Sequence, residues 1–157
     1  MNEILVSKDG YNQYLSLIKE LEKKLNENGT NSTESCVSAV GDGWHDNFSF
    51  EALMEDGRKL NYQINKLKNE KQKIKIIDDT YEEELININD KVNIKFIYDN
   101  NDIEEEQILL TGNYLPVDNE ITLNSPLGKT IYKQKNNSKL EYKVNDNIIK
   151  IEIKKIQ

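Results

Sequence analysis

Apolar residues recur every three or four positions along two stretches of the N-terminal half. The first begins near Ser7 and contains Tyr11, Tyr14, Ile18, Leu21 and Leu25. The second covers residues 47–76 and contains Phe50, Leu53, Gly57, Leu60, Ile64, Leu67, Lys71 and Ile74. This spacing places one apolar stripe along each of two helices. Two such helices joined by a turn predict an antiparallel coiled-coil hairpin.

The region between the two stripes contains weak helix formers and then a turn. Residues 26–35 are rich in Asn, Gly, Thr and Ser, so we expect a defect in the first helix there. Gly41 and Gly43 flank Asp42 and favour a tight reversal. Asp46 or Asn47 can then cap the second helix. The carboxylates of Asp42 and Asp46 are thus predicted at the end of the hairpin, where ordinary turn and capping roles are the alternative interpretation.

The helical period stops after residue 78 and gives way to alternating runs. Alternation predicts strands over 92–98, 107–111, 120–123, 139–144 and 148–153. Ser125 followed by Pro126 predicts the start of a short helix. The predicted class is therefore α+β. A coiled coil over residues 1–78, with an acidic tip near 42–50, precedes a small domain over 79–157 with a twisted antiparallel sheet and one helix.

The composition limits which kinds of partner the chain can bind and in which cellular compartment we expect it. The net charge of −7 over 157 residues argues against non-specific nucleic-acid binding by the whole chain. A basic group near the end of the second helix is either a solvated face or a nucleic-acid track; it comprises Lys66, Lys68, Lys71, Lys73 and Lys75. Cys36 is the only cysteine, which excludes an intramolecular disulfide and suits a reducing cytosol. No apolar run approaches the ~20 residues of a membrane span, so we expect a cytoplasmic protein without a membrane partner.

The chain shows no self-sufficient active site. It has no Ser–His–Asp or Cys–His set, no glycine-rich phosphate loop and no zinc-ligand spacing. His45, the only histidine, lies between Asp42 and Asp46, so a transition-metal site is conceivable in the turn. Trp44 is either a lid packed over the turn or a wedge against a partner. We therefore expect a protein that is not an enzyme and has no cofactor of its own.

Three motifs resemble one known family. Residues 121–129, Ile-Thr-Leu-Asn-Ser-Pro-Leu-Gly-Lys, resemble a segment of the bacterial Gre transcript-cleavage factors. Gly41-Asp42 followed by Asp46-Asn47-Phe48-Ser49-Phe50 is similar to that family's coiled-coil tip, an Asp, two residues, then Glu-Asn-x-x-Tyr. Residues 6–11 are similar to the family's N-terminal start. The resemblance extends over nearly the whole chain.

The resemblance implies a monomeric accessory factor of bacterial RNA polymerase. Its C-terminal domain would be FKBP-like and dock at the rim of the polymerase secondary channel, and its coiled coil would enter that channel. Asp42 and Asp46 would then help hold a second Mg²⁺ while the polymerase hydrolyses the displaced RNA 3′ end. Asn47 and Phe50 match the other tip positions. The docking segment corresponds to Ser125, Pro126, Leu127, Gly128 and Lys129.

The tip departs from the family pattern in three ways. Three residues instead of two separate Asp42 from the next carboxylate, Asp46 replaces a longer Glu, and Phe50 lacks the Tyr hydroxyl. Small displacements of a catalytic group reduce rates steeply. Stimulation of RNA cleavage is our leading hypothesis. A factor that occupies the channel and inhibits the polymerase is the alternative, and a coiled-coil scaffold unrelated to transcription is a third.

Overall fold

The computed structural model describes residues 2–38 and 48–156. The chain divides into two compact units, one formed by residues 14–73 and the other by residues 1–13 together with 74–157. We call them the helical unit and the sheet unit. The α+β class predicted from the sequence is confirmed.

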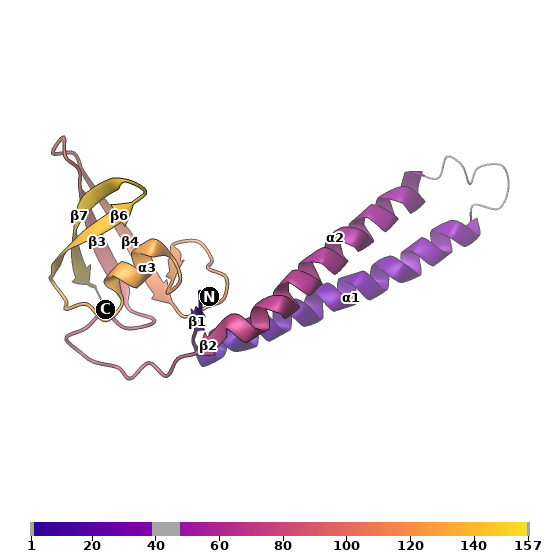
Figure 1. Cartoon of the computed structure of the whole chain (residues 1–157), viewed down its shortest axis with the longest axis horizontal. Helices are drawn as coiled ribbons and strands as arrows, with labels where there is room; N and C mark the ends of the chain where they lie inside the picture. Colours follow the sequence, from indigo (N-terminus) through magenta and orange to yellow (C-terminus); the bar gives the residue numbers. More distant parts are fainter. Residues whose placement is uncertain (1, 39–47, 157) are drawn as a thin grey trace. The chain divides into compact units, whose positions relative to one another are not determined.

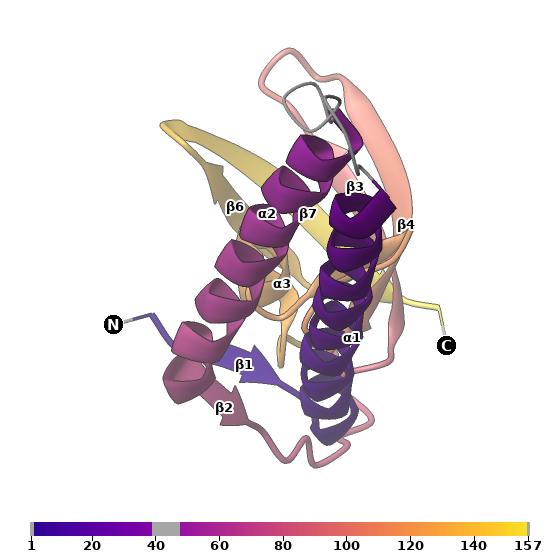
Figure 2. The ribbon, with the colours of Figure 1, turned by 90° about the vertical axis from the view of Figure 1, so that its right-hand side faces the viewer.

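The helical unit is built from α1 (Lys8–Ser38), which begins in the sheet unit, and α2 (Phe48–Glu70). The two helices run antiparallel, side by side (Figures 1 and 2). Their predicted stripes face each other: Tyr14 is fully buried and donates its hydroxyl to the carbonyl of Leu67 at 2.6 Å, and Ile64 is 4% exposed. Burial of these stripes stabilises the pair, because helices of this length gain most of their stability from packing.

The predicted defect in the first helix is wrong, because α1 continues through residues 26–35. Two hydroxyls bond back to the carbonyl four residues earlier, Thr30 to Asn26 at 3.2 Å and Thr33 to Gly29 at 3.0 Å. The side-chain amide of Asn28 also donates to the carbonyl of Leu53 in α2 at 2.9 Å. Contacts with the second helix therefore override the weak intrinsic propensity of this stretch.

The second helix ends earlier than its apolar stripe predicts. α2 stops at Glu70, and a 3₁₀ turn η2 (Lys71–Lys73) leads into β2 (Ile74–Ile76). β2 pairs in parallel with β1 (Ile4–Val6), with Ile4 opposite Ile74. Ile74 fits the helical spacing of the stripe, but Ile74 and Ile76 also fit the two-residue spacing of a strand. Pairing with β1, which is distant in sequence, favours the strand.

The main sheet has the strand order β5-β4-β3-β7-β6. Its strands are β3 (Lys91–Ile97), β4 (Ile103–Thr111), β5 (Glu120–Thr122), β6 (Lys139–Val144) and β7 (Asn147–Lys155). All neighbours are antiparallel except β4 and β5, so the prediction of a wholly antiparallel sheet is wrong at this edge. Alternating residues such as Val92, Ile94 and Phe96 pack with Ile131 of α3 (Pro126–Ile131) in the core.

The start of the chain is fixed to the sheet unit. The side-chain amide of Asn124 accepts from the backbone N–H of Leu5 at 2.7 Å and donates to the Leu5 carbonyl at 2.8 Å. The backbone N–H of Ser7 donates to the carbonyl of Gly112 at 2.8 Å. These contacts explain why the first 13 residues group with the sheet, whereas the sequence predicted a single boundary at residue 78.

A close backbone approach at Gly10 gives a test of this attachment. A Cβ at Gly10 would lie 2.0 Å from the carbonyl oxygen of Gly112, whereas a Cβ at Gly29, also in α1, meets nothing within 4 Å. We expect Gly10→Ala to lower the free energy of unfolding by about 3 kcal/mol or more. Gly29→Ala should raise it by about 0.5–1 kcal/mol through helix propensity. Urea unfolding followed by circular dichroism measures both, and a Gly10→Ala protein as stable as wild type would contradict the structure.

Candidate functional site

The segment from Ser125 to Lys129 forms the start of α3, and Ser125 caps it. The Ser125 hydroxyl oxygen accepts from the backbone N–H of Gly128 at 2.9 Å, and the hydroxyl donates to the carbonyl of Thr122 at 2.9 Å. Pro126 occupies the first turn of the helix, where its missing N–H leaves no bond unmade. The sequence prediction of a Ser-capped helix with Pro in its first turn is confirmed.

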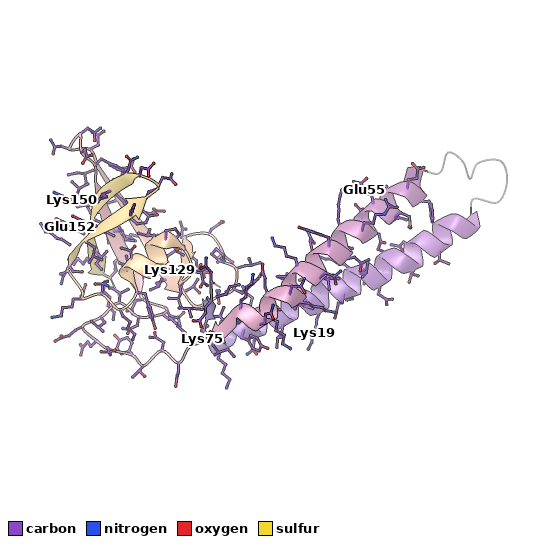
Figure 3. All side chains as sticks on the ribbon, viewed as in Figure 1. Lys19, Glu55, Lys75, Lys129, Lys150 and Glu152 are labelled. Atoms are coloured by element: carbon purple, nitrogen blue, oxygen red, sulfur yellow. The ribbon has the colours of Figure 1, made fainter. Side chains whose placement is uncertain are left out.

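Most of this segment faces inward. Gly128 is buried, and a Cβ there would lie 2.0 Å from the carbonyl oxygen of Thr122, so the site requires glycine. Leu127 packs against the core. Of the five predicted docking residues, Pro126 and Lys129 are the ones classed as exposed, and Figure 3 shows Lys129 on α3. The segment therefore mainly stabilises the fold, and only the side chains of Pro126 and Lys129 are exposed to solvent.

A polar cluster lies at the other end of α3. Tyr132 donates its hydroxyl to Asp79 at 2.9 Å, and the Lys133 ammonium lies 2.8 Å from the same carboxylate oxygen. The other oxygen of Asp79 accepts from the backbone N–H of Ile88 at 2.7 Å. Lys133 also donates to the side-chain oxygen of Asn87 at 2.8 Å. These bonds connect the end of α3 to the segment between β2 and β3.

The cluster changes the acidity of its members. Burial alone would raise the pKa of Asp79, but the hydrogen bonds from Lys133, Ile88 and Tyr132 outweigh it and lower that pKa. Burial, together with the hydrogen bond to Asp79, raises the pKa of Tyr132 to about 12. Asp79 is therefore ionised and Tyr132 protonated at neutral pH, which is the pairing that the geometry requires.

A second ion pair joins the same segment to the end of β7. The Lys155 ammonium lies 2.9 Å from the carboxylate of Asp90 and donates to the Tyr81 hydroxyl at 3.0 Å, and the Lys155 and Asp90 side chains are 11% and 7% exposed. Burial would lower the pKa of Lys155, but its bonds with Asp90 and Tyr81 raise it. Asn87, fully buried, donates its backbone N–H to Asp90 at 2.7 Å. Every charge in this network has a partner, so we assign it to stability and not to chemistry.

The predicted acidic tip lies mostly outside the described residues. Asp42, Asp46 and Asn47 fall there, as do Trp44 and His45. Phe50 is in the first turn of α2 and is half-buried. Among the described residues, no group of three His, Cys, Asp or Glu side chains could hold a metal ion. No helix in that part of the chain has the length and apolar character needed to span a membrane.

Sequence comparison identifies the C-terminal half. Residues 81–157 match the sequence model described as transcription elongation factor, GreA/GreB, C-terminal domain. Residues 81–157 therefore form a GreA/GreB-type C-terminal domain. The matched residues contain α3 with its Ser125 cap, the main sheet and most of the polar network. No curated protein sequence matches the chain.

Three solved structures align with this chain along almost its whole length. A structure of the transcription factor Gfh1 is 16% identical, with 100% of each chain covered and a TM-score of 0.45. Gfh1, the GreA factor homolog 1 of Thermus thermophilus, is 16% identical, with 98% of this chain and 97% of that one covered and a TM-score of 0.44. A GreA/GreB factor from Nitrosomonas europaea is 12% identical, with 99% and 98% covered and a TM-score of 0.35.

Sequence analysis missed the polar network. No motif marks Asp79 or Asp90 as a paired carboxylate, and Lys133 and Lys155 are two of the many lysines in the sequence. No local pattern identifies them, because their partners are 46 to 74 residues away in the chain. One available signal was Asn87, which lies between two apolar residues in an otherwise acidic connection.

The lowered pKa of Asp79 predicts a specific acid response. A carboxyl whose folded pKa is below its unfolded value of about 3.9 stabilises the fold above that value, and this contribution is lost as the pH falls through the folded pKa. We expect Asp79→Asn to lower the free energy of unfolding by about 2–3 kcal/mol at pH 7. The difference from wild type should shrink as the pH falls below about 4 and through the lowered pKa of Asp79. Urea unfolding across pH measures it, with Asp146→Asn in the exposed β6–β7 turn as the control; a pH-independent difference would refute the assignment.

Proposed function

We propose that this chain is an accessory factor of bacterial RNA polymerase that acts through the polymerase secondary channel. The observation that carries the proposal is the GreA/GreB match over residues 81–157. The docking domain would be the sheet unit, with an FKBP-like fold, and the coiled coil that enters the channel would be the helical unit. The factor would have no enzymatic activity of its own and would work as a monomer in the cytoplasm.

Docking on the polymerase is proposed to use the exposed part of α3. Pro126 contributes a rigid apolar contact, and Lys129 contributes a cation that no ion pair engages within the described residues. Ser125, Leu127 and Gly128 would act indirectly, by holding the turn that presents these two side chains. The chemistry suits a partner surface that combines an apolar contact with a carboxylate.

The tip is proposed to stimulate hydrolysis of backtracked RNA at its 3′ end. Asp42 and Asp46 would be the residues that contact a second Mg²⁺ belonging to the polymerase, and carboxylate oxygens are the donors that this ion prefers. When bound, such an ion supplies activation of water for phosphodiester hydrolysis. Asn47 would orient the neighbouring groups, and Phe50, half-buried in the first turn of α2, would support the base of the tip.

Inhibition of the polymerase without cleavage is the second candidate function. It is favoured by the extra residue between Asp42 and Asp46, by the shorter Asp at the second position and by the absence of a hydroxyl on Phe50. Each change alters the reach or the hydrogen bonding of the tip, and misplacement by about 1 Å can reduce a rate about 100-fold. A factor with such a tip would still occupy the channel.

An RNA cleavage assay separates the two functions. Stalled, backtracked polymerase is incubated with wild type, Asp42→Ala, Asp46→Ala and, as a control from the exposed face of α2, Asp56→Ala. Stimulation predicts short RNA products with wild type and Asp56→Ala, reduced about 100-fold or more in the two tip variants. Slower elongation without products would establish inhibition, and failure to bind polymerase at all would exclude both.

Docking is tested by reversing one charge. We expect Lys129→Glu to weaken binding to RNA polymerase about tenfold or more, because it places a carboxylate where the partner would supply one. Lys143→Glu, at an exposed position of the edge strand β6, is the matched control and should bind as wild type does. Binding is measured by fluorescence anisotropy with labelled factor. Equal affinities for the two variants would exclude α3 as the docking surface.

A further inference from the structure

The apolar seam of α1 is followed, after Leu25, by a polar residue at the next seam position. Tyr14, Leu21 and Leu25 follow the seam, and the next seam position, three residues after Leu25, is Asn28. Residues 26–35 contain no apolar side chain. The part of α1 up to Leu25 thus packs by apolar contacts, while residues 26–35 lack the side chains that normally align two helices.

Asn28 makes a directional contact with α2 at this position. Its side-chain amide donates to the backbone carbonyl of Leu53 at 2.9 Å, and the residue is half-buried. Gly57 lies one turn further along α2, and a Cβ on Gly57 would be 2.9 Å from the side-chain oxygen of Asn28. A methyl group at Gly57 would therefore have to displace the amide of Asn28 from its present position.

We propose that Asn28 and Gly57 form a register lock, which fixes the axial offset of α1 relative to α2. Apolar seam residues resemble one another every three or four positions, so they tolerate a slide of one helix by a turn. The amide of Asn28 does not, because after such a slide it would face side chains of α2 instead of a carbonyl next to a glycine. A polar group left half-buried without its partner is unfavourable.

The register lock bears on the proposed function, on which this consequence rests. α1 ends at Ser38 and α2 begins at Phe48. The axial offset of the two helices therefore sets the relative position of these two residues, which flank residues 39–47. Asn28 and Gly57 would be positioning residues for the tip, with no contact to RNA or metal of their own.

A double-mutant cycle tests the register lock in the free protein. Alanine favours a helix over glycine by about three- to fivefold in equilibrium constant. We expect Gly29→Ala to raise the hydrogen-exchange protection of nearby amides by that factor. Gly57→Ala should instead lower the protection of amides 53–60 about threefold or more, because it displaces Asn28. In an Asn28→Ala background Gly57→Ala should become protective. If Gly57→Ala protects as Gly29→Ala does with Asn28 intact, the register lock does not exist.

Distance measurement tests the offset directly. Asn26 and Asn61 line the same groove between α1 and α2, so cysteines there can carry a spin-label pair in a Cys36→Ser background. We expect one narrow distance in this protein and in the Asn31→Leu control, an exposed Asn of the same stretch. Asn28→Leu should change the distance or add a second population, because a slide by one helical turn moves one label about 5 Å along the pair axis. An unchanged distance in Asn28→Leu would overturn the proposal.

The two free-protein experiments separate the register lock from the proposed function. They decide the lock without polymerase, so a wild-type chain that fails to stimulate cleavage leaves their outcome intact. If wild type does stimulate cleavage, Asn28→Leu should reduce it together with the distance shift. Full cleavage by a chain with a shifted distance would exclude the positioning role.

Discussion

The contact between the start of α1 and the end of β4 is the constraint on which the sheet unit depends. Gly10 approaches the carbonyl of Gly112 closely enough that no side chain fits between them, and Ser7 donates its backbone N–H to the same carbonyl. The side-chain amide of Asn124 satisfies both backbone groups of Leu5 in the way a neighbouring strand would. The first 13 residues consequently fold with the last 84, although the whole helical unit separates them in sequence.

At α3, most residues of the segment from Ser125 to Lys129 make contacts that stabilise the fold. Ser125 supplies the cap, Gly128 the close approach to Thr122, and Leu127 a core contact. Only side chains not committed to these contacts can meet a partner. The segment from Ser125 to Lys129 is therefore informative about structure at most of its positions and about binding at few.

In the described part of the chain, two ion pairs shielded from solvent join distant segments. Asp79 and Asp90 are paired with Lys133 and Lys155, and each pair is completed by hydrogen bonds to the backbone or to a tyrosine. Breaking such a pair would leave an uncompensated charge, so each pair both stabilises the fold and favours one arrangement of the connecting segment. In the helical unit, Asn28 has a comparable role with a neutral amide.

The sequence by itself determined the two apolar stripes, most strands of the main sheet and the capped start of α3, because each is a local pattern with its own period or cap. It did not determine the continuity of α1 through residues 26–35, the end of α2 at Glu70 or the parallel pairing of β4 with β5. Those features depend on partners far away in the chain: Leu53 for Asn28, Ile4 for Ile74, and Leu109 for Glu120. Local propensities differ by about 1 kcal/mol or less per residue, so one tertiary hydrogen bond or a paired strand is enough to reverse them.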